Sequence, residues 1–116
     1  MIIQQVIDFL EEKAPTVYQE SYDNSGLLTG SSSDNLSGIL VCLDVIEEIV
    51  DEAISKKCNL IVAHHPIIFS GLKRLSGNSY IELVIRKAIK NDIAIYAIHT
   101  NLDNRFRGIG KLFLSM

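Results

Sequence analysis

Residues 60–69, with the sequence LIVAHHPIIF, constrain the fold of this chain more than any other stretch. The run begins with four uninterrupted apolar residues, a pattern typical of a strand that is buried on both faces, as in parallel sheets. Pro66 cannot donate a hydrogen bond to a neighbouring strand and restricts the residue before it, so the strand should end at the histidines. His64 and His65 are therefore predicted at the carboxyl end of a buried strand, where open α/β sheets bind their ligands.

Two further apolar runs, residues 39–43 and 93–98, predict two more strands, and segments with apolar residues at helical spacing separate the three. The order strand, helix, strand, helix, strand with short connections gives right-handed crossovers and parallel strands whose faces are covered by helices. Residues 2–13 predict another amphipathic helix, and residues 27–28 a short strand between two turns.

The ends of the two crossover helices are predicted from local signals. Asp44 and Glu47 have the spacing of a capping box at the start of the first helix, and Asn59 is expected to end it in a left-handed conformation. Ser79 and Glu82 repeat the capping spacing at the second helix. The apolar faces expected to point inward are Val45, Ile46, Ile49, Val50, Ala53 and Ile54 in the first helix, and Ile81, Val84, Ile85, Ala88 and Ile89 in the second.

Composition excludes several classes of protein. With 47% hydrophobic and 22% charged residues, the 116-residue chain is expected to form one globular domain over residues 1–116. A net charge of −3 gives no signature of nucleic-acid binding. No apolar run approaches the roughly 20 residues that span a membrane, and there is no secretory leader pattern. With only two cysteines, the sequence predicts a protein of the reducing cytoplasm.

Metal-ligating residue types follow the predicted strands. Because parallel strands end at one edge of a sheet, this edge should gather Asp44, His64, His65, His99 and Asp103. Neutral imidazoles and carboxylates together suit Zn, Mn, Fe, Co or Ni better than Ca. The convergence therefore predicts a metal site, while histidines that only satisfy local hydrogen bonds are the plainer alternative.

The two adjacent histidines restrict how such a site can be built. Successive side chains of a regular strand face opposite ways, but a backbone broken by proline lets His64 and His65 serve one ion or two neighbouring ions. Two ions about 3.5–4 Å apart would activate water for hydrolysis. Acid–base catalysis by histidine without a metal needs a nucleophile that the sequence does not identify, and no G-x-S-x-G motif is present.

Three segments together resemble a known family. Residues 22–28 (YDNSGLL), 63–69 (AHHPIIF) and 99–104 (HTNLDN) are similar, in order and spacing, to the Nif-three-like family, whose members are named GTP cyclohydrolase 1 type 2 homologues. The expected fold is then the N-terminal portion of the Nif-three-like fold, a three-layer α/β arrangement with a largely parallel sheet that is mixed at the edge. The resemblance also implies two bound divalent metal ions and a homo-oligomer, a hexamer in the family.

The resemblance assigns roles to individual residues. It implies that His64, His65 and Asp103 are metal ligands, and that His99 lies beside the metals as a ligand or proton-transfer group, which makes it the candidate catalytic residue. Residues 23–24 would lie near the mouth of the pocket.

The expected function follows from these roles. We expect a dinuclear metal-binding protein that hydrolyses a small-molecule substrate, a nucleotide or phosphoester. Lys73 and Arg74 are candidate contacts for a phosphate, although loop cations are commonly just solvated. The chain ends at Met116, short of the usual family length, so it is expected to be truncated relative to the family. The alternative is therefore a non-catalytic metal-binding or protein-interaction module, a remnant of a longer enzyme.

Overall fold

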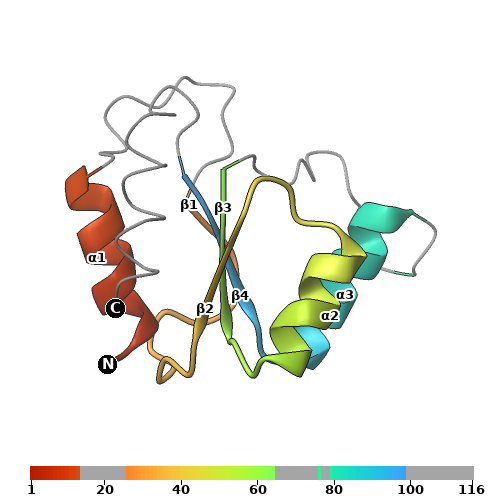
Figure 1. The fold of residues 1–116 in the computed structure, drawn as a ribbon, viewed down its shortest axis with the longest axis horizontal. Helices are drawn as coiled ribbons and strands as arrows, with labels where there is room; N and C mark the ends of the chain where they lie inside the picture. The colour runs from red at the N-terminus through yellow and green to blue at the C-terminus, as the bar shows by residue number, and fades with distance from the viewer. Residues whose placement is uncertain (14–25, 65–75, 77–78, 99–116) are drawn as a thin grey trace.

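The structure, a computed structural model, describes residues 1–13, 26–64, 76 and 79–98 (Figure 1). The helices and strands are α1 (Ile3–Lys13), β1 (Gly26–Thr29), β2 (Ile39–Cys42), α2 (Glu47–Ser55), β3 (Leu60–Ala63), α3 (Tyr80–Lys90) and β4 (Ala94–Ala97). Each corresponds to an element that the sequence predicts, and only the bounds differ by a few residues.

The four strands form one sheet in the order β1-β4-β3-β2. Strands β2, β3 and β4 are parallel, and β1 pairs antiparallel with β4 at one edge. This confirms the expected largely parallel sheet with a mixed edge. In the register of the parallel strands, Cys42 lies opposite Ala63, which lies opposite Ala97. The three carboxyl ends are therefore level.

Helices cover both faces of the sheet, which gives three layers. Helix α1 lies on one face, and α2 and α3 lie side by side on the other (Figure 1). Successive residues of β3 alternate between the two cores: Leu60 and Val62 pack in the core with α1, and Ile61 and Ala63 pack in the core with α2 and α3. All four are buried, as expected of a strand enclosed on both faces.

The predicted capping box at the start of α2 is wrong. The N-cap is Ile46, in an extended conformation and without a side-chain cap. Asp44 lies instead in an exposed bend, because the chain first carries Val45 into the core, where its side chain is 4% exposed. The carboxylate of Glu47 accepts a hydrogen bond from Lys87 of α3 at 2.8 Å, an interaction between helices rather than within one.

The end of α2 also differs from the prediction. Lys57, not Asn59, takes the left-handed conformation, with a φ of 58°. The side chain of Asn59 serves another purpose: its Oδ1 accepts a hydrogen bond from the Ser37 amide at 2.8 Å, and its Nδ2 donates to the Asn35 carbonyl at 2.6 Å. Asn59 thereby ties the start of β3 to the segment that leads into β2.

The start of α3 confirms the predicted N-cap. The Ser79 hydroxyl accepts a hydrogen bond from the Glu82 amide at 3.3 Å. The Glu82 carboxylate does not return to Ser79; it accepts a hydrogen bond from the Ser76 amide, also at 3.3 Å.

Three residues predicted to face inward are exposed. Ile46, Ile54 and Ile89 are 43%, 39% and 51% exposed. The sheet buries only the middle of each apolar stripe, Val50 and Ala53 in α2 and the corresponding residues of α3. The stripes are wider than the sheet covers, so their flanks remain in solvent.

Candidate metal site at the carboxyl edge of the sheet

The candidate site lies where β2, β3 and β4 end. The parallel ladder continues one residue beyond the strands: the His64 amide donates to the Cys42 carbonyl at 3.0 Å, and the Ile98 amide donates to the Ala63 carbonyl at 2.9 Å. These two bonds hold His64 at the central position of the edge, between the ends of β2 and β4.

His64 is one of two buried polar or charged residues in the described part of the chain, with 7% of its surface exposed. The alternation that places Leu60 and Val62 on the α1 side gives position 64 the same face. A polar ring that is nearly closed to water is costly unless it binds a partner. The burial of His64 fits a metal ligand and a hydrogen-bonded ring equally. Both predictions from the sequence, a metal site and a histidine that satisfies local hydrogen bonds, therefore stand.

The connection from β2 to α2 forms the exposed rim of this edge. Asp44 follows the end of β2 by two residues, as the sequence predicts, and is exposed. Leu43 beside it is 59% exposed. Burial, followed by the charges of Asp44 and Glu52, raises the pKa of the Cys42 thiol to about 12. Cys42 is therefore a neutral thiol near pH 7, which suits packing rather than metal ligation.

The remaining predicted site residues, His65, His99 and Asp103, lie outside the described residues, as do residues 23–24 and 73–74. The structure consequently places one of the four assigned residues, His64. Within residues 1–13, 26–64, 76 and 79–98, no group of three histidine, cysteine, aspartate or glutamate side chains could hold a metal ion. The predicted metal centre stays a prediction.

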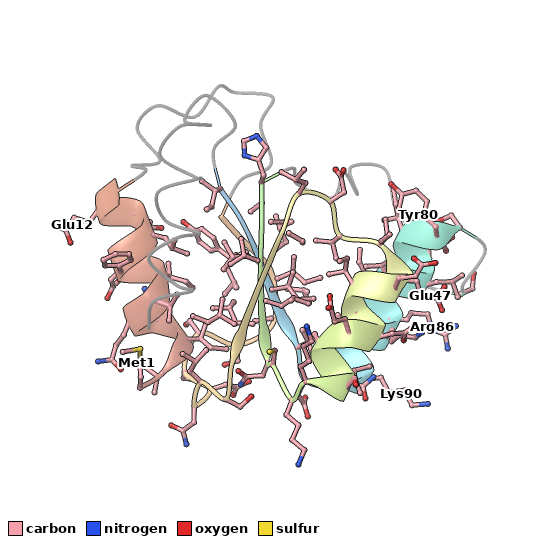
Figure 2. All side chains as sticks on the ribbon, viewed as in Figure 1. Met1, Glu12, Glu47, Tyr80, Arg86 and Lys90 are labelled. Carbon is pink, nitrogen blue, oxygen red and sulfur yellow. The ribbon has the colours of Figure 1, made fainter. Side chains whose placement is uncertain are left out.

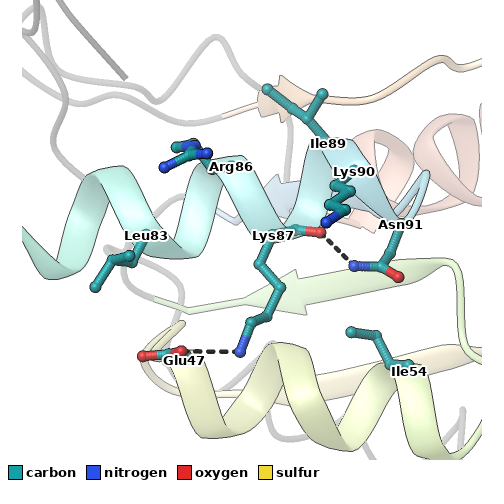
Figure 3. Close-up of a pocket in the computed structure, with 8 residues that line it drawn as sticks. All are labelled: Glu47, Ile54, Leu83, Arg86, Lys87, Ile89, Lys90 and Asn91. Atoms are coloured by element: carbon teal, nitrogen blue, oxygen red, sulfur yellow. Dashed lines mark hydrogen bonds and ion pairs between the residues drawn. The ribbon is translucent and has the colours of Figure 1, made fainter. Parts of the chain in front are cut away.

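A second polar cluster joins the two helices on the opposite face from α1. The ammonium of Lys87 lies 2.8 Å from Glu47 Oε1 (Figure 3). It also lies 2.7 Å from Asp51 Oδ1. Its hydrogen bonds to Asp51 and Glu47 raise the pKa of Lys87 above its usual value. The sequence does not predict this bridge, because nothing in local spacing pairs residues 36 or 40 positions apart.

Among the described residues, no helix has the length and apolar character needed to cross a membrane.

Comparison with protein families gives one match over the full length. The model for Duf34/NIF3 (NGG1p interacting factor 3) matches residues 1–116. A curated relative from Bacillus subtilis (strain 168), named GTP cyclohydrolase 1 type 2 homolog, is 42% identical over 109 residues, which are 94% of this chain and 29% of the relative. A relative of the same name from Staphylococcus epidermidis is 40% identical over 112 residues, 97% of this chain and 30% of the relative.

Solved structures agree with the fold. The Staphylococcus aureus protein SA1388 superposes with a TM-score of 0.83 at 45% identity, over 89% of this chain and 29% of that protein. The Bacillus cereus protein related to NIF3 gives a TM-score of 0.82 at 42% identity, over 89% and 28%. The chain thus spans about 30% of the length of the curated relatives it matches.

Proposed function

The chain belongs to the Duf34/NIF3 family, and we propose that it binds divalent metal ions at the carboxyl edge of its sheet and hydrolyses a nucleotide or another phosphoester. In this proposal His64, His65 and Asp103 are ligands of two metal ions, and His99 transfers a proton. The metals are Zn, Mn, Fe, Co or Ni, which imidazole and carboxylate ligands suit.

One observation carries the proposal: His64 is buried at the end of the central strand, level with the ends of both neighbouring parallel strands. In the sequence, the chain continues from this point into His65, and from the end of β4 through Ile98 into His99. Ligand sites of open parallel sheets form at this edge. The residue types support the same chemistry, because a bound divalent ion lowers the pKa of its water and supplies hydroxide near neutral pH.

A non-catalytic metal-binding or interaction module is the second candidate. It is favoured by the coverage of the relatives, since about 70% of each relative has no counterpart in this chain. Any ligand or catalytic group that lies in that part of a relative therefore has no equivalent among these 116 residues. This candidate predicts bound metal without turnover.

The proposal extends to a homo-oligomer in the cytoplasm. Both cysteines, Cys42 and Cys58, are free, as expected of a protein in a reducing compartment. Family membership is consistent with self-association.

Two measurements separate the candidates. Elemental analysis of the purified chain should find metal, and its removal by a chelator should abolish hydrolysis of GTP or of bis-p-nitrophenyl phosphate. The Asp103→Asn variant should lose both metal and turnover. Metal without turnover in the unmodified chain would favour the binding module. Turnover that survived both chelation and Asp103→Asn would exclude the metal-dependent hydrolase. Absence of metal would exclude both the hydrolase and the metal-binding module, and would leave only the interaction module.

A further inference from the structure

Exposed apolar side chains gather on the α2 and α3 side of the molecule. Among the described residues, eight large apolar side chains are exposed, and five of them belong to these helices or to the N-cap of α2. The five are Ile46, Ile54, Tyr80, Leu83 and Ile89. Single exposed apolar residues are ordinary, but a concentration of them marks an interaction surface.

Between the two helices lies an open groove of about 660 Å³, which we term the α2–α3 groove. Figure 3 shows its lining. The residues that line it are Glu47, Ile54, Leu83, Arg86, Lys87, Ile89, Lys90 and Asn91. Lys87 of α3 joins this helix to α2 through ion pairs with Glu47 and Asp51, so the two helices are held side by side. The groove is thus a fixed surface of the molecule.

The two helices that border the groove expose opposite charges. Helix α2 exposes Glu48 and Asp51, whereas α3 exposes Arg86 and Lys90. In the part of the chain that the structure describes, neither Arg86 nor Lys90 forms an ion pair, and neither does Glu48. An acidic strip (Glu48 and Asp51) and a basic strip (Arg86 and Lys90) therefore run next to each other, and among the described residues Asp51 is the one of these four that already pairs, with Lys87.

The direction of the helices makes this surface self-complementary. Figure 3 shows Glu47 beside Leu83 at one end of the groove and Ile54 beside Asn91 at the other, so α2 and α3 run the same way. A two-fold axis parallel to the helices would place α2 of one copy over α3 of the other at the same height. A two-fold axis across the helices would set acidic strip on acidic strip.

The positions of residues along the helix axes indicate which charges of the two copies would meet. Lys87 reaches both Glu47 and Asp51, which sets its level between these two residues. Arg86, its neighbour in α3, then lies at about the level of Glu48. Under the parallel two-fold axis, each Arg86 faces the Glu48 of the second copy, twice per dimer.

We propose that the α2–α3 groove is the surface on which a second copy of this chain docks, with a two-fold axis parallel to the two helices. Docking removes Ile54 and Leu83 from water and pairs Arg86 and Lys90 with the acidic strip of the second copy. The inference rests only on the self-association in the proposed function and is independent of the metal site.

Sedimentation equilibrium of the purified 116-residue chain, with a pair of charge reversals, tests the proposal. The unmodified chain should dimerise, more weakly at high salt. Arg86→Glu and Glu48→Arg should each weaken dimerisation about tenfold, because each sets like charges together at two symmetric contacts. Mixing the two variants should restore the affinity to within about twofold, since both contacts of the mixed dimer again join opposite charges.

The controls separate this surface from general effects of charge. Glu12→Arg reverses an exposed carboxylate of α1, on the other face of the sheet, and should leave dimerisation unchanged (Figure 2). Circular dichroism should show that all variants fold, because Arg86 and Glu48 are exposed. A chain that stays monomeric at every concentration would overturn the proposal. The same result is expected if the groove binds a different protein, so that case also overturns it. Dimers that ignore both reversals, or variants that fail to complement each other, would place self-association elsewhere. Metal content is read separately, so the two proposals can fail independently.

Discussion

The amide of His64, one residue beyond the end of β3, donates a hydrogen bond of 3.0 Å to the carbonyl of Cys42, the last residue of β2. This bond uses only main-chain atoms. It fixes the backbone of residue 64 at the sheet edge whatever side chain is present, since Cys42 also lies in register with Ala63. The position of the histidine and the chemistry of its ring are thus separable by mutation.

His64→Ala should lower metal affinity by about tenfold or more while the sheet remains folded. The backbone bond to Cys42 persists in the variant, whereas the imidazole, which we propose as a ligand, is lost. Metal titration followed by elemental analysis measures the effect, and circular dichroism checks the fold. Asp34→Asn, an exposed carboxylate ahead of the amino end of β2 and so away from this edge, is the matched comparison and should keep its metal. Equal metal content in His64→Ala and the unmodified chain would remove His64 from the ligand set.

Gly30→Ala should destabilise the protein by about 2–4 kcal/mol. Gly30 has a φ of +101°, and a Cβ atom there would lie 2.5 Å from the Cβ and 2.6 Å from the Cα of Ala94. Denaturant unfolding measures the loss. Gly26 is the matched control, because its φ of +109° carries similar strain while a Cβ would meet nothing within 4 Å. Gly26→Ala should therefore cost about 1–2 kcal/mol, and an equal loss at both sites would contradict the steric argument.

Asn59→Ala should cost about 1–3 kcal/mol of unfolding free energy. The variant removes two hydrogen bonds, one from the Ser37 amide and one to the Asn35 carbonyl, which join segments more than 20 residues apart. Asn91→Ala is the control, since the exposed amide of Asn91 bonds only to the Lys87 carbonyl within the same helix end. Denaturant unfolding should find a loss below about 1 kcal/mol for the control. Similar losses in both variants would argue against the long-range role of Asn59.

Sequence predicted the elements of this fold because their signals are local. The apolar run of β3 and the cap formed by Ser79 both depend on residues adjacent in the chain, and both are confirmed. Asp44 has the same spacing as Ser79 but does not cap α2, because burial of Val45 takes precedence over a capping bond. The exposure of Ile89 could not be predicted either, since it depends on how much of the helix the sheet can cover.

The candidate site was predictable to the same degree. The end of a parallel strand follows from its sequence, so the placement of His64 at the sheet edge is confirmed. The Lys87 bridge was not predictable, because it needs the relative position of two helices. The convergence of His65, His99 and Asp103 lies outside the described residues and stays a prediction.

The Cys42 thiol should resist modification and make the protein less stable at alkaline pH. Burial, with smaller effects from Asp44 and Glu52, raises the pKa of Cys42 from 9.0 to about 12. The folded protein therefore holds this proton more tightly than the unfolded chain. Its contribution to stability is complete below about pH 9 and is lost as the pH rises toward 12. Urea unfolding at pH 8, 9 and 10 should show that the free energy of unfolding falls as the pH rises. The fall should be smaller in Cys42→Ala than in the unmodified protein, with each protein compared with its own value at pH 8.

Tyr96 provides the control for that decline. Burial raises the pKa of Tyr96 from 10.0 to about 12, with a smaller effect from Glu11. Its contribution to stability is therefore lost from about pH 10 upward, one pH unit above the start of the loss for Cys42. Tyr96→Phe should consequently leave the change in stability between pH 8 and 9 intact and reduce the change between pH 9 and 10. Iodoacetamide at pH 8.5 should modify Cys42 far more slowly in the folded protein than in urea, because the thiolate is the reactive form. Rapid labelling of folded Cys42 at that pH, with the fold intact, would show that the thiol is not held in its protonated state.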